Sequence, residues 1–279
     1  MSYSVQKTQT KKHIMKNTTI EFNSETSGLI TSDSPWTESV NGSYQDMLLK
    51  QEFATRRYKF PVGETWFRIV PSLKGSAKGP ILGAYVLNYK SGRHVHPRTL
   101  NPGAKSVFDA AYQWYKTHRP EDLYSKQNKV GLKLLADPVC LLWMITELDG
   151  HLTSRLLTAS GYSGGRGGTA GLGHQIWDLS RETDEDGQLL GNPADPMLGT
   201  QICVLKQQAP GARFPSYLVK RGRLAAPINE MLDKMTNDDV SVITALEDVI
   251  RIPAHEEEWQ LLENVIGKDN AEQIRNDLD

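Results

Sequence analysis

The stretch VCLLWMITELDGHLTSRLL, residues 139–157, decides the fold class. It contains two short apolar runs, Val139–Thr146 and Leu152–Leu157, enriched in the β-branched and aromatic residues that favour strands. The dipeptide Asp149-Gly150 lies between them, and such a pair is a strong short-range signal of a hairpin turn. We therefore predict two antiparallel strands in the middle of the chain.

Similar runs occur on both sides of this hairpin, at Thr65–Val70, Pro80–Leu87 and Gln201–Leu205, each bounded by Gly, Pro or Asp. Helical patterns interrupt or follow the strands at Lys105–Lys116, His174–Leu179, Ile228–Met235, Asp239–Val249 and Glu256–Ile266. The alternation of strands with long helical crossovers that a parallel sheet needs is absent from the sequence. The prediction is a mainly β protein with α elaborations. We expect an OB-fold-like small β-barrel with an inserted helix and a helical C-terminal region.

Composition divides the chain into three predicted parts. Residues 1–47 are rich in Ser, Thr, Asn and Lys without apolar periodicity, which predicts a flexible polar arm. Residues 48–235 form the predicted single-stranded nucleic-acid-binding core, and residues 236–279 an acidic helical region and tail. Only residues 270–279 resemble a free tail.

Charge is distributed unevenly along the chain. Residues 229–279 carry fourteen Asp and Glu against four Lys and Arg, whereas residues 1–228 carry nineteen against twenty-eight. This asymmetry is typical of a polyanion-binding body with an acidic tail, although a solvated acidic helix explains it equally well. No run of 18 apolar residues exists, and the basic N-terminus lacks the apolar segment of a secretory signal. Cys140 and Cys203 lie within apolar runs, which favours buried thiols in a reduced, cytoplasmic protein.

Nucleotide-binding and enzymatic chemistry finds little support in the sequence. The glycine-rich stretch GYSGGRGGTAGLGH, residues 161–174, fails the phosphate-loop test because no lysine occurs between Lys133 and Lys206. It also lies outside any βαβ unit, as a dinucleotide fingerprint would require. Neither a nucleophile elbow nor a catalytic carboxylate pair is present. We predict that the protein is not an enzyme and needs no cofactor.

The pair His94 and His96 could place two imidazoles on one face of a strand. No cysteine pair or carboxylate cluster accompanies them in the sequence, and Arg93 and Arg98 lie beside them. A basic polar surface is therefore the favoured interpretation, and no metal site is predicted. Whether the two histidines bind a metal stays open at this point.

Basic residues interleaved with aromatics are the strongest functional signal. Single-stranded nucleic acid needs cations along its phosphates and flat rings on which exposed bases stack. The predicted nucleic-acid-binding residues are Arg56, Arg57, Tyr58, Tyr85, Tyr89, Lys90, Arg93, Arg98, Lys116, Lys129, Lys133, Arg155, Tyr162, Arg166, Lys206, Arg213, Phe214, Tyr217, Lys220 and Arg221.

Not every ring in these runs is available for stacking. Trp66, Trp114 and Trp143 lie within apolar runs and are expected in the core. Phe214 and Tyr217 follow Pro210-Gly211 in a basic stretch, which predicts an exposed loop. The glycine-rich stretch, with Tyr162 and Arg166, is interpreted as a strand-to-helix flap ordered by ligand, or else as a merely flexible loop.

The order of these elements resembles the single-stranded DNA-binding (helix-destabilising) proteins of tailed phages. The resemblance covers roughly residues 60–235 and rests on four segments. These are a strand ending in Pro-Ser at Phe67–Ser72, the apolar strand Val139–Thr146, a Gly-x-x-Ile-Trp-Asp segment at Gly173–Asp178, and Asp195–Lys206 leading into Phe214-Pro-Ser-Tyr217. The resemblance implies an OB-fold core whose DNA cleft is lined by Phe214 and Tyr217.

Two features depart from that family. Its best-known member holds zinc through one histidine and three cysteines in an insertion, and the matching stretch Arg93–Arg119 has no cysteine. The chain therefore resembles a zinc-free variant in which the helix Lys105–Lys116 does the packing. The family also begins with a basic arm that docks onto a neighbouring protomer, and Lys7, Lys11, Lys12 and Lys16 match its charge but not its motif.

From residues and resemblance together we expect a sequence-tolerant single-stranded DNA-binding protein of a bacteriophage or mobile element. It would coat exposed strands in DNA replication, recombination or repair in the host cytoplasm. The acidic C-terminal region would recruit replication or recombination proteins, and self-association on DNA is conceivable. Two alternatives stay open: an RNA-binding OB-fold protein, and a non-enzymatic phage structural or interaction protein whose basic and aromatic segments scatter over the surface.

Overall fold

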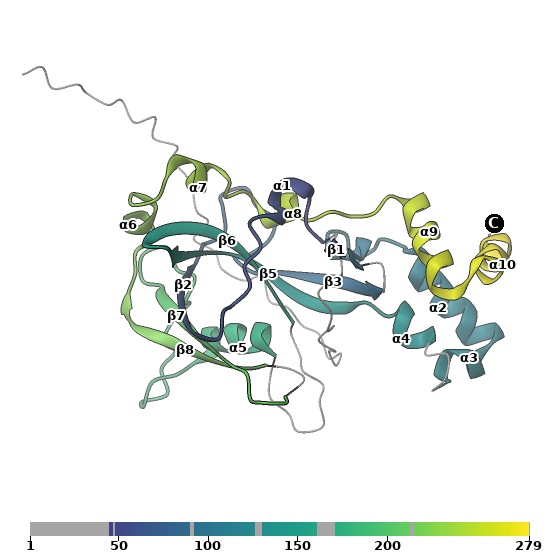
Figure 1. Cartoon of the computed structure of the whole chain (residues 1–279), viewed down its shortest axis with the longest axis horizontal. Coiled ribbons are helices and arrows are strands. Elements are labelled where there is room, and N and C mark those ends of the chain that lie inside the picture. Colours follow the sequence, from purple (N-terminus) through teal and green to yellow (C-terminus); the bar gives the residue numbers. More distant parts are fainter. Residues whose placement is uncertain are drawn as a thin grey trace, which may run out of the picture.

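A computed structural model describes residues 45–46, 48–89, 92–125, 130–160, 171–212 and 215–278. It is a mixed α/β protein built around one sheet (Figure 1). The strands are β1 (Gln45–Asp46), β2 (Gly63–Ile69), β3 (Leu82–Tyr89), β4 (Gly92–Val95), β5 (Asp137–Leu148), β6 (His151–Ser160), β7 (Thr200–Gln207) and β8 (Ser216–Ala225). The helices are α1 (Gln51–Ala54), α2 (Val107–His118), α3 (Pro120–Tyr124), α4 (Val130–Leu134), α5 (Leu172–Asp178), α6 (Ile228–Leu232), α7 (Asn237–Ser241), α8 (Leu246–Val249), α9 (His255–Ile266) and α10 (Lys268–Leu278). Two 3-10 turns, η1 (Pro97–Thr99) and η2 (Leu179–Arg181), complete the list.

Strand β5 organises the sheet. One of its edges pairs with β6 from Val139 to Leu148, and the other pairs first with β3 and then with β2. Two half-sheets therefore share β5, one continuing through β3, β4 and β1 and the other through β2, β7 and β8. Among the described strands, every strand-to-strand pairing is antiparallel except that of β1 with β4.

The predicted central hairpin is confirmed. Leu148 pairs with His151, and the turn residues Asp149 and Gly150 have φ values of 51° and 79°. Positive φ at both central positions is the backbone that a tight two-residue hairpin requires. The other predicted strands form as β2, β3 and β7, and the inserted helix forms as α2.

Three hydrophobic clusters fill the molecule. In the half-sheet of β3 and β4, one face packs with α1, α6 and α8, and the other packs with α2, α9 and α10. In the half-sheet of β2 and β7, one face packs against α5 and the turn after it. Cys140 belongs to this third cluster and Cys203 is also buried, as predicted.

Arg57 and Arg93 lie far apart in the pairing order of the first half-sheet. Arg57 lies beside β6 through a bridge to Leu156, whereas Arg93 lies on β4, three strands away in the pairing order. Burial lowers the pKa of Arg57 to about 10, and the charge of Arg93 adds to this effect. The pairings of the described strands define an open sheet, and closure into a barrel is not among them.

The C-terminal region differs from prediction in two places. The expected helix Asp239–Val249 is two short helices, α7 and α8. Residues 268–278 form α10, so the prediction of a free tail from residue 270 is wrong. Ala271 and Ile274, spaced to share one helical face, are buried in the cluster with α2 and α9, and this contact holds the segment helical.

Candidate nucleic-acid interface

Those predicted binding residues that the structure describes do not gather in one groove. Lys90, Lys129, Tyr162, Arg166, Arg213 and Phe214 lie outside the described residues, as does the glycine-rich stretch up to residue 170. The others fall in three places. Tyr85, Tyr89, Arg93, Arg98, Lys116 and Lys133 lie around β3, β4 and the α2–α4 helices. Arg56, Arg57, Tyr58 and Arg155 lie along β6, and Lys206, Tyr217, Lys220 and Arg221 lie on β7 and β8.

Several predicted phosphate ligands instead hold the fold together. The Arg221 guanidinium pairs with the Glu182 carboxylate at 3.1 Å and donates to the carbonyls of Leu179, Leu190 and Gly191. Arg56 forms an ion pair with Asp239 of α7. These contacts fix loops against the sheet, so the prediction that these arginines serve nucleic acid receives no support from their geometry.

Arg57 and Arg93 belong to an internal polar cluster. Arg57 Nε donates to Thr158 Oγ1 at 3.1 Å, and Asn88 Nδ2 donates to Asp137 Oδ2 at 2.7 Å. Burial lowers the pKa of Arg93, while the Asp137 charge acts in the opposite direction. Burial raises the pKa of Asp137, against the effects of Asn88 and Arg93. Arg57 and Arg93 are half-buried in this cluster rather than exposed on a basic surface.

Two of the predicted stacking rings are already occupied. Tyr89 is buried and stacks on Phe108 of α2 with ring centroids 5.6 Å apart. Burial, with the nearby Glu258 charge, raises the pKa of Tyr89 well above its ordinary value. The Arg98 guanidinium lies 4.0 Å from the centre of the Tyr85 ring. Tyr89 is therefore a core residue, and the prediction that it stacks on bases is wrong.

His94 and His96 are also interior residues, contrary to the predicted basic surface. His96 Nδ1 accepts from the Arg98 N–H at 3.2 Å, and its Nε2 lies 3.1 Å from Asp109 Oδ2. This pairing lowers the pKa of Asp109 despite the opposing effect of burial. Among the residues that the structure describes, no three His, Cys, Asp or Glu side chains are placed to hold a metal ion.

Tyr217 lies on β8, not on an exposed loop as predicted. Its half-buried ring packs edge-on against Phe60 at 6.5 Å, and Phe60 packs in the same manner against Tyr58 at 5.2 Å. The Lys206 ammonium donates to the Phe60 carbonyl at 2.9 Å. These rings and this cation do come together, but they form the border of the cluster over α5.

An exposed ring and an exposed cation share a surface on the other side of β2, β7 and β8, away from α5. Trp66 is 46% exposed there, and Leu218 is 45% exposed. Trp66 pairs across the sheet with Cys203, which pairs with the exposed Lys220 of the edge strand β8. One ring and one cation thus share a face, about 10 Å apart by strand spacing. We call this surface, with Trp66, Cys203, Leu218, Lys220 and Gly222, the Trp66 face.

Two further observations define the Trp66 face. A Cβ on Gly222 would lie 3.5 Å from Trp66 Cζ3 and 2.9 Å from the Gln201 carbonyl, so the indole lies against bare backbone. Burial raises the pKa of the Cys203 thiol, the Glu64 charge adds to the rise, and Lys220 opposes it. Glu64 therefore lies close to the row of Trp66, Cys203 and Lys220, and its negative charge makes the Trp66 face less basic on that side.

Trp66 was predicted to be buried, and this is wrong, although Trp114 and Trp143 are buried as expected. The signal that identifies it is the period-2 pattern of its own strand. Thr65, Phe67 and Ile69 are buried on one face, which leaves Trp66 on the other. The apolar run around it concealed this alternation.

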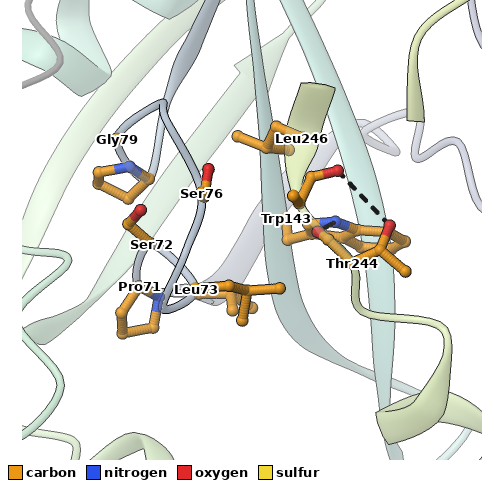
Figure 2. A pocket seen from close by; sticks show the side chains of 11 residues that line it. Pro71, Ser72, Leu73, Ser76, Gly79, Trp143, Thr244 and Leu246 are labelled. Atoms are coloured by element: carbon orange, nitrogen blue, oxygen red, sulfur yellow. Dashed lines mark hydrogen bonds between the residues drawn. The ribbon is translucent and has the colours of Figure 1, made fainter. Parts of the chain in front are cut away.

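A small cleft elsewhere is no competing ligand site. Figure 2 shows it between the β2–β3 loop, with Ser72 and Ser76, and the segment carrying Thr244, with Trp143 beside it. Its cavity volume is about 10 Å³ and none of its lining residues is charged. This is below the usual size of small-molecule pockets. The Trp143 ring N–H donates to the Thr244 carbonyl at 2.9 Å, so that indole is committed to the fold.

Within the described part of the chain, no helix is long and apolar enough to cross a membrane. No protein-family model matches the sequence, and a search of curated proteins finds no significant relative. The resemblance to phage DNA-binding proteins consequently stays a prediction.

Proposed function

We propose that the chain is a sequence-tolerant single-stranded DNA-binding protein and that the strand lies across the Trp66 face. The observation that carries the proposal is the exposed indole of Trp66 in one cross-strand row with Lys220. A tryptophan that stays exposed to water on an inner strand gives up the favourable free energy of burying its indole. Such an exposed ring is typical of a contact surface. Base–aromatic stacking is worth ~1–3 kcal/mol per base and tolerates any sequence.

The distribution of charge supports this position. Strand β8 carries the exposed cations Lys220 and Arg223 and no acidic residue, while the charge of Arg221 is paired with Glu182. The helices α9 and α10 carry seven Asp and Glu against two Lys and Arg. Figure 1 places α9 and α10 at one end of the long axis, with β7 and β8 toward the other. A polyanion is thus drawn toward β8 and away from the acidic helices.

The architecture is compatible with an elaborated OB fold, which forms part of the same proposal. A largely antiparallel sheet with a short helix between β6 and β7 has the layout that the phage family resemblance implies. In this role the protein coats exposed strands in the host cytoplasm during phage or mobile-element DNA replication, recombination or repair. The acidic helices α9 and α10 provide the contact for replication or recombination proteins.

The decisive experiment is a fluorescence-polarisation titration of labelled oligo-dT, oligo-U and duplex DNA at several salt concentrations. We expect tight oligo-dT binding, much weaker duplex binding, and steep loss of affinity with salt. Trp66→Ala should weaken oligo-dT binding about 5- to 150-fold, the equivalent of one lost stack. Lys220→Ala should reduce the salt slope by roughly 0.7, the value for one phosphate contact on a single strand.

The matched controls lie at the other end of the molecule. Tyr124 of α3 is 67% exposed, and Lys133 of α4 is exposed. Tyr124→Ala and Lys133→Ala therefore remove one exposed aromatic ring and one exposed cation away from the Trp66 face. Both should bind oligo-dT as the native protein does. Equal affinity for duplex and single strand, or equal losses at Tyr124 and Trp66, would refute the proposal. Preference for oligo-U over oligo-dT would assign RNA as the ligand.

A further inference from the structure

Glu64 is an exposed acidic residue on the strand that carries Trp66. It lies two residues before Trp66 on β2, so both side chains project from the same face of the sheet, roughly 7 Å apart along the strand. Thr65, between them, points to the other side and is buried. Within the described part of the chain, the Glu64 carboxylate has no hydrogen-bond or ion-pair partner, so its oxygens are available to accept from a ligand.

The cross-strand register places Glu64 next to the row of Trp66, Cys203 and Lys220. Glu64 pairs with Leu205 of β7, two positions along from the pairing of Trp66 with Cys203. The Glu64 charge helps to raise the pKa of the Cys203 thiol, while the Lys220 charge opposes the rise. Cys203 is therefore within electrostatic reach of an acid on β2 and of a base on β8. The Trp66 face has a negative end on the inner strand and a positive end on the edge strand.

The indole of Trp66 extends from β2 toward β8. Its Cζ3 atom lies 3.5 Å from the position that a Cβ on Gly222 would occupy, and Gly222 lies on β8, two strands away from β2. Cys203, on β7 between these strands, is only 2% exposed. Three groups thus follow one another across the sheet: the Glu64 carboxylate at β2, the Trp66 ring across β7, and the Lys220 ammonium at β8.

A nucleotide of a single strand has a matching order of groups. Its phosphate and the Watson–Crick edge of its base lie at opposite ends, with the flat faces of the base between them. When the phosphate lies at Lys220 and the base stacks on Trp66, the Watson–Crick edge points toward β2 and Glu64. A carboxylate accepts hydrogen bonds and donates none, so it matches the amino group of cytosine. Thymine and uracil have a carbonyl oxygen at that position, which a carboxylate repels.

We propose that Glu64 selects, in the strand bound at the Trp66 face, bases with an amino group on the Watson–Crick edge over thymine and uracil. This inference rests on the proposed function, because that function places the base on Trp66. Stacking on the indole still accepts every base, so Glu64 adds a preference and not a fixed sequence. The expected preference is about 5-fold, the low end of the range for a base-edge contact, because water competes at the exposed carboxylate.

The test compares oligo-dC with oligo-dU in fluorescence-polarisation titrations of the full chain at neutral pH. The two polymers share one backbone and differ at the base edge, where an amino group replaces a carbonyl oxygen. The native protein should bind oligo-dC about 5-fold more tightly than oligo-dU. Glu64→Gln has an amide that both donates and accepts, and should bring the two affinities within about twofold of each other. Glu121→Gln on α3 removes an exposed carboxylate elsewhere and should keep the native ratio.

The ratio of the two affinities separates base selection from simple repulsion. If Glu64 only repels phosphates, Glu64→Gln strengthens binding to both polymers equally and leaves the ratio unchanged, which overturns the proposal. A native chain that binds oligo-dU as tightly as oligo-dC also overturns it, while its binding of single strands leaves the proposed function standing. Failure of the native chain to bind any single strand refutes the proposed function itself, and this inference with it.

Discussion

Replacing Arg68 by methionine should be among the most damaging single substitutions in this protein. The Arg68 side chain is completely buried on β2 and donates to four backbone carbonyls. Two belong to Pro193 and Asp195, one to Ala226 at 2.9 Å, and one to Ile69 at 2.8 Å. Burial lowers the pKa of Arg68 to about 10, while the Asp195 charge opposes the shift, so it stays charged at neutral pH.

The expected cost follows from the carbonyls left behind. Each buried acceptor without a donor costs ~1–3 kcal/mol, and methionine preserves most of the stem volume but no donor. Some carbonyls will reach water when the loop relaxes, so we expect a loss of about 3–5 kcal/mol in the free energy of unfolding. This is a large share of the ~5–15 kcal/mol that holds a typical domain folded.

Urea unfolding followed by far-UV circular dichroism measures this loss directly. Arg223→Met, on the exposed end of β8, is the control and should change stability by less than ~0.5 kcal/mol. Gly199→Ala should reproduce part of the Arg68 effect, because a Cβ there would lie 2.2 Å from Arg68 Nη2 and 2.5 Å from two carbonyl oxygens. A loss below ~1 kcal/mol in Arg68→Met would show that the carbonyl contacts are not what holds the loop.

Three further substitutions test other contacts. Burial raises the pKa of Glu258, so its stabilising contribution is complete below the ordinary pKa of glutamate and is lost as pH rises through the raised value. Glu258→Gln keeps an acceptor for the Ser106 hydroxyl, now 2.7 Å away, and should flatten the dependence of the urea midpoint on pH above the ordinary pKa of glutamate; an unchanged slope would contradict this. Gln175→Ala removes two 3.1 Å hydrogen bonds between its side-chain amide and the backbone of β8, and should cost about 1–3 kcal/mol in thermal unfolding, whereas no loss would mean that water replaces the amide fully. Gly150→Ala, at φ 79°, should cost about 1 kcal/mol by the same measurement, and a neutral result would indicate that the turn adopts another backbone conformation.

The sequence predicts the central strands well because their local signals agree with their final positions. The Asp149-Gly150 turn and the apolar runs beside it need no distant partner to be recognised. The start of β8, at Tyr217, is predicted as an exposed loop, since an edge strand exposed on much of both faces has no clean apolar alternation. Helix α10 was missed because only Ala271 and Ile274 are buried in an otherwise charged segment.

The candidate site was predicted less well, and for a physical reason. Interleaved arginines and rings look the same in sequence whether they meet a nucleic acid or one another. Arg98 lies over Tyr85 and Arg57 bonds to Thr158, and neither pairing is visible before the chain folds. Lys220 was among the predicted residues, but its neighbour Trp66 was not, because the strand pairing that joins them spans more than 150 residues.

The sharing of β5 between the two half-sheets has a consequence for how the molecule opens. Because β5 supplies hydrogen-bond partners to β6, β3 and β2, its loss exposes backbone in both halves at once. The two halves should therefore unfold as one cooperative unit. Amide hydrogens along β5 should exchange with solvent only through that global event, while those at the outer edge of β8 exchange through smaller, local openings.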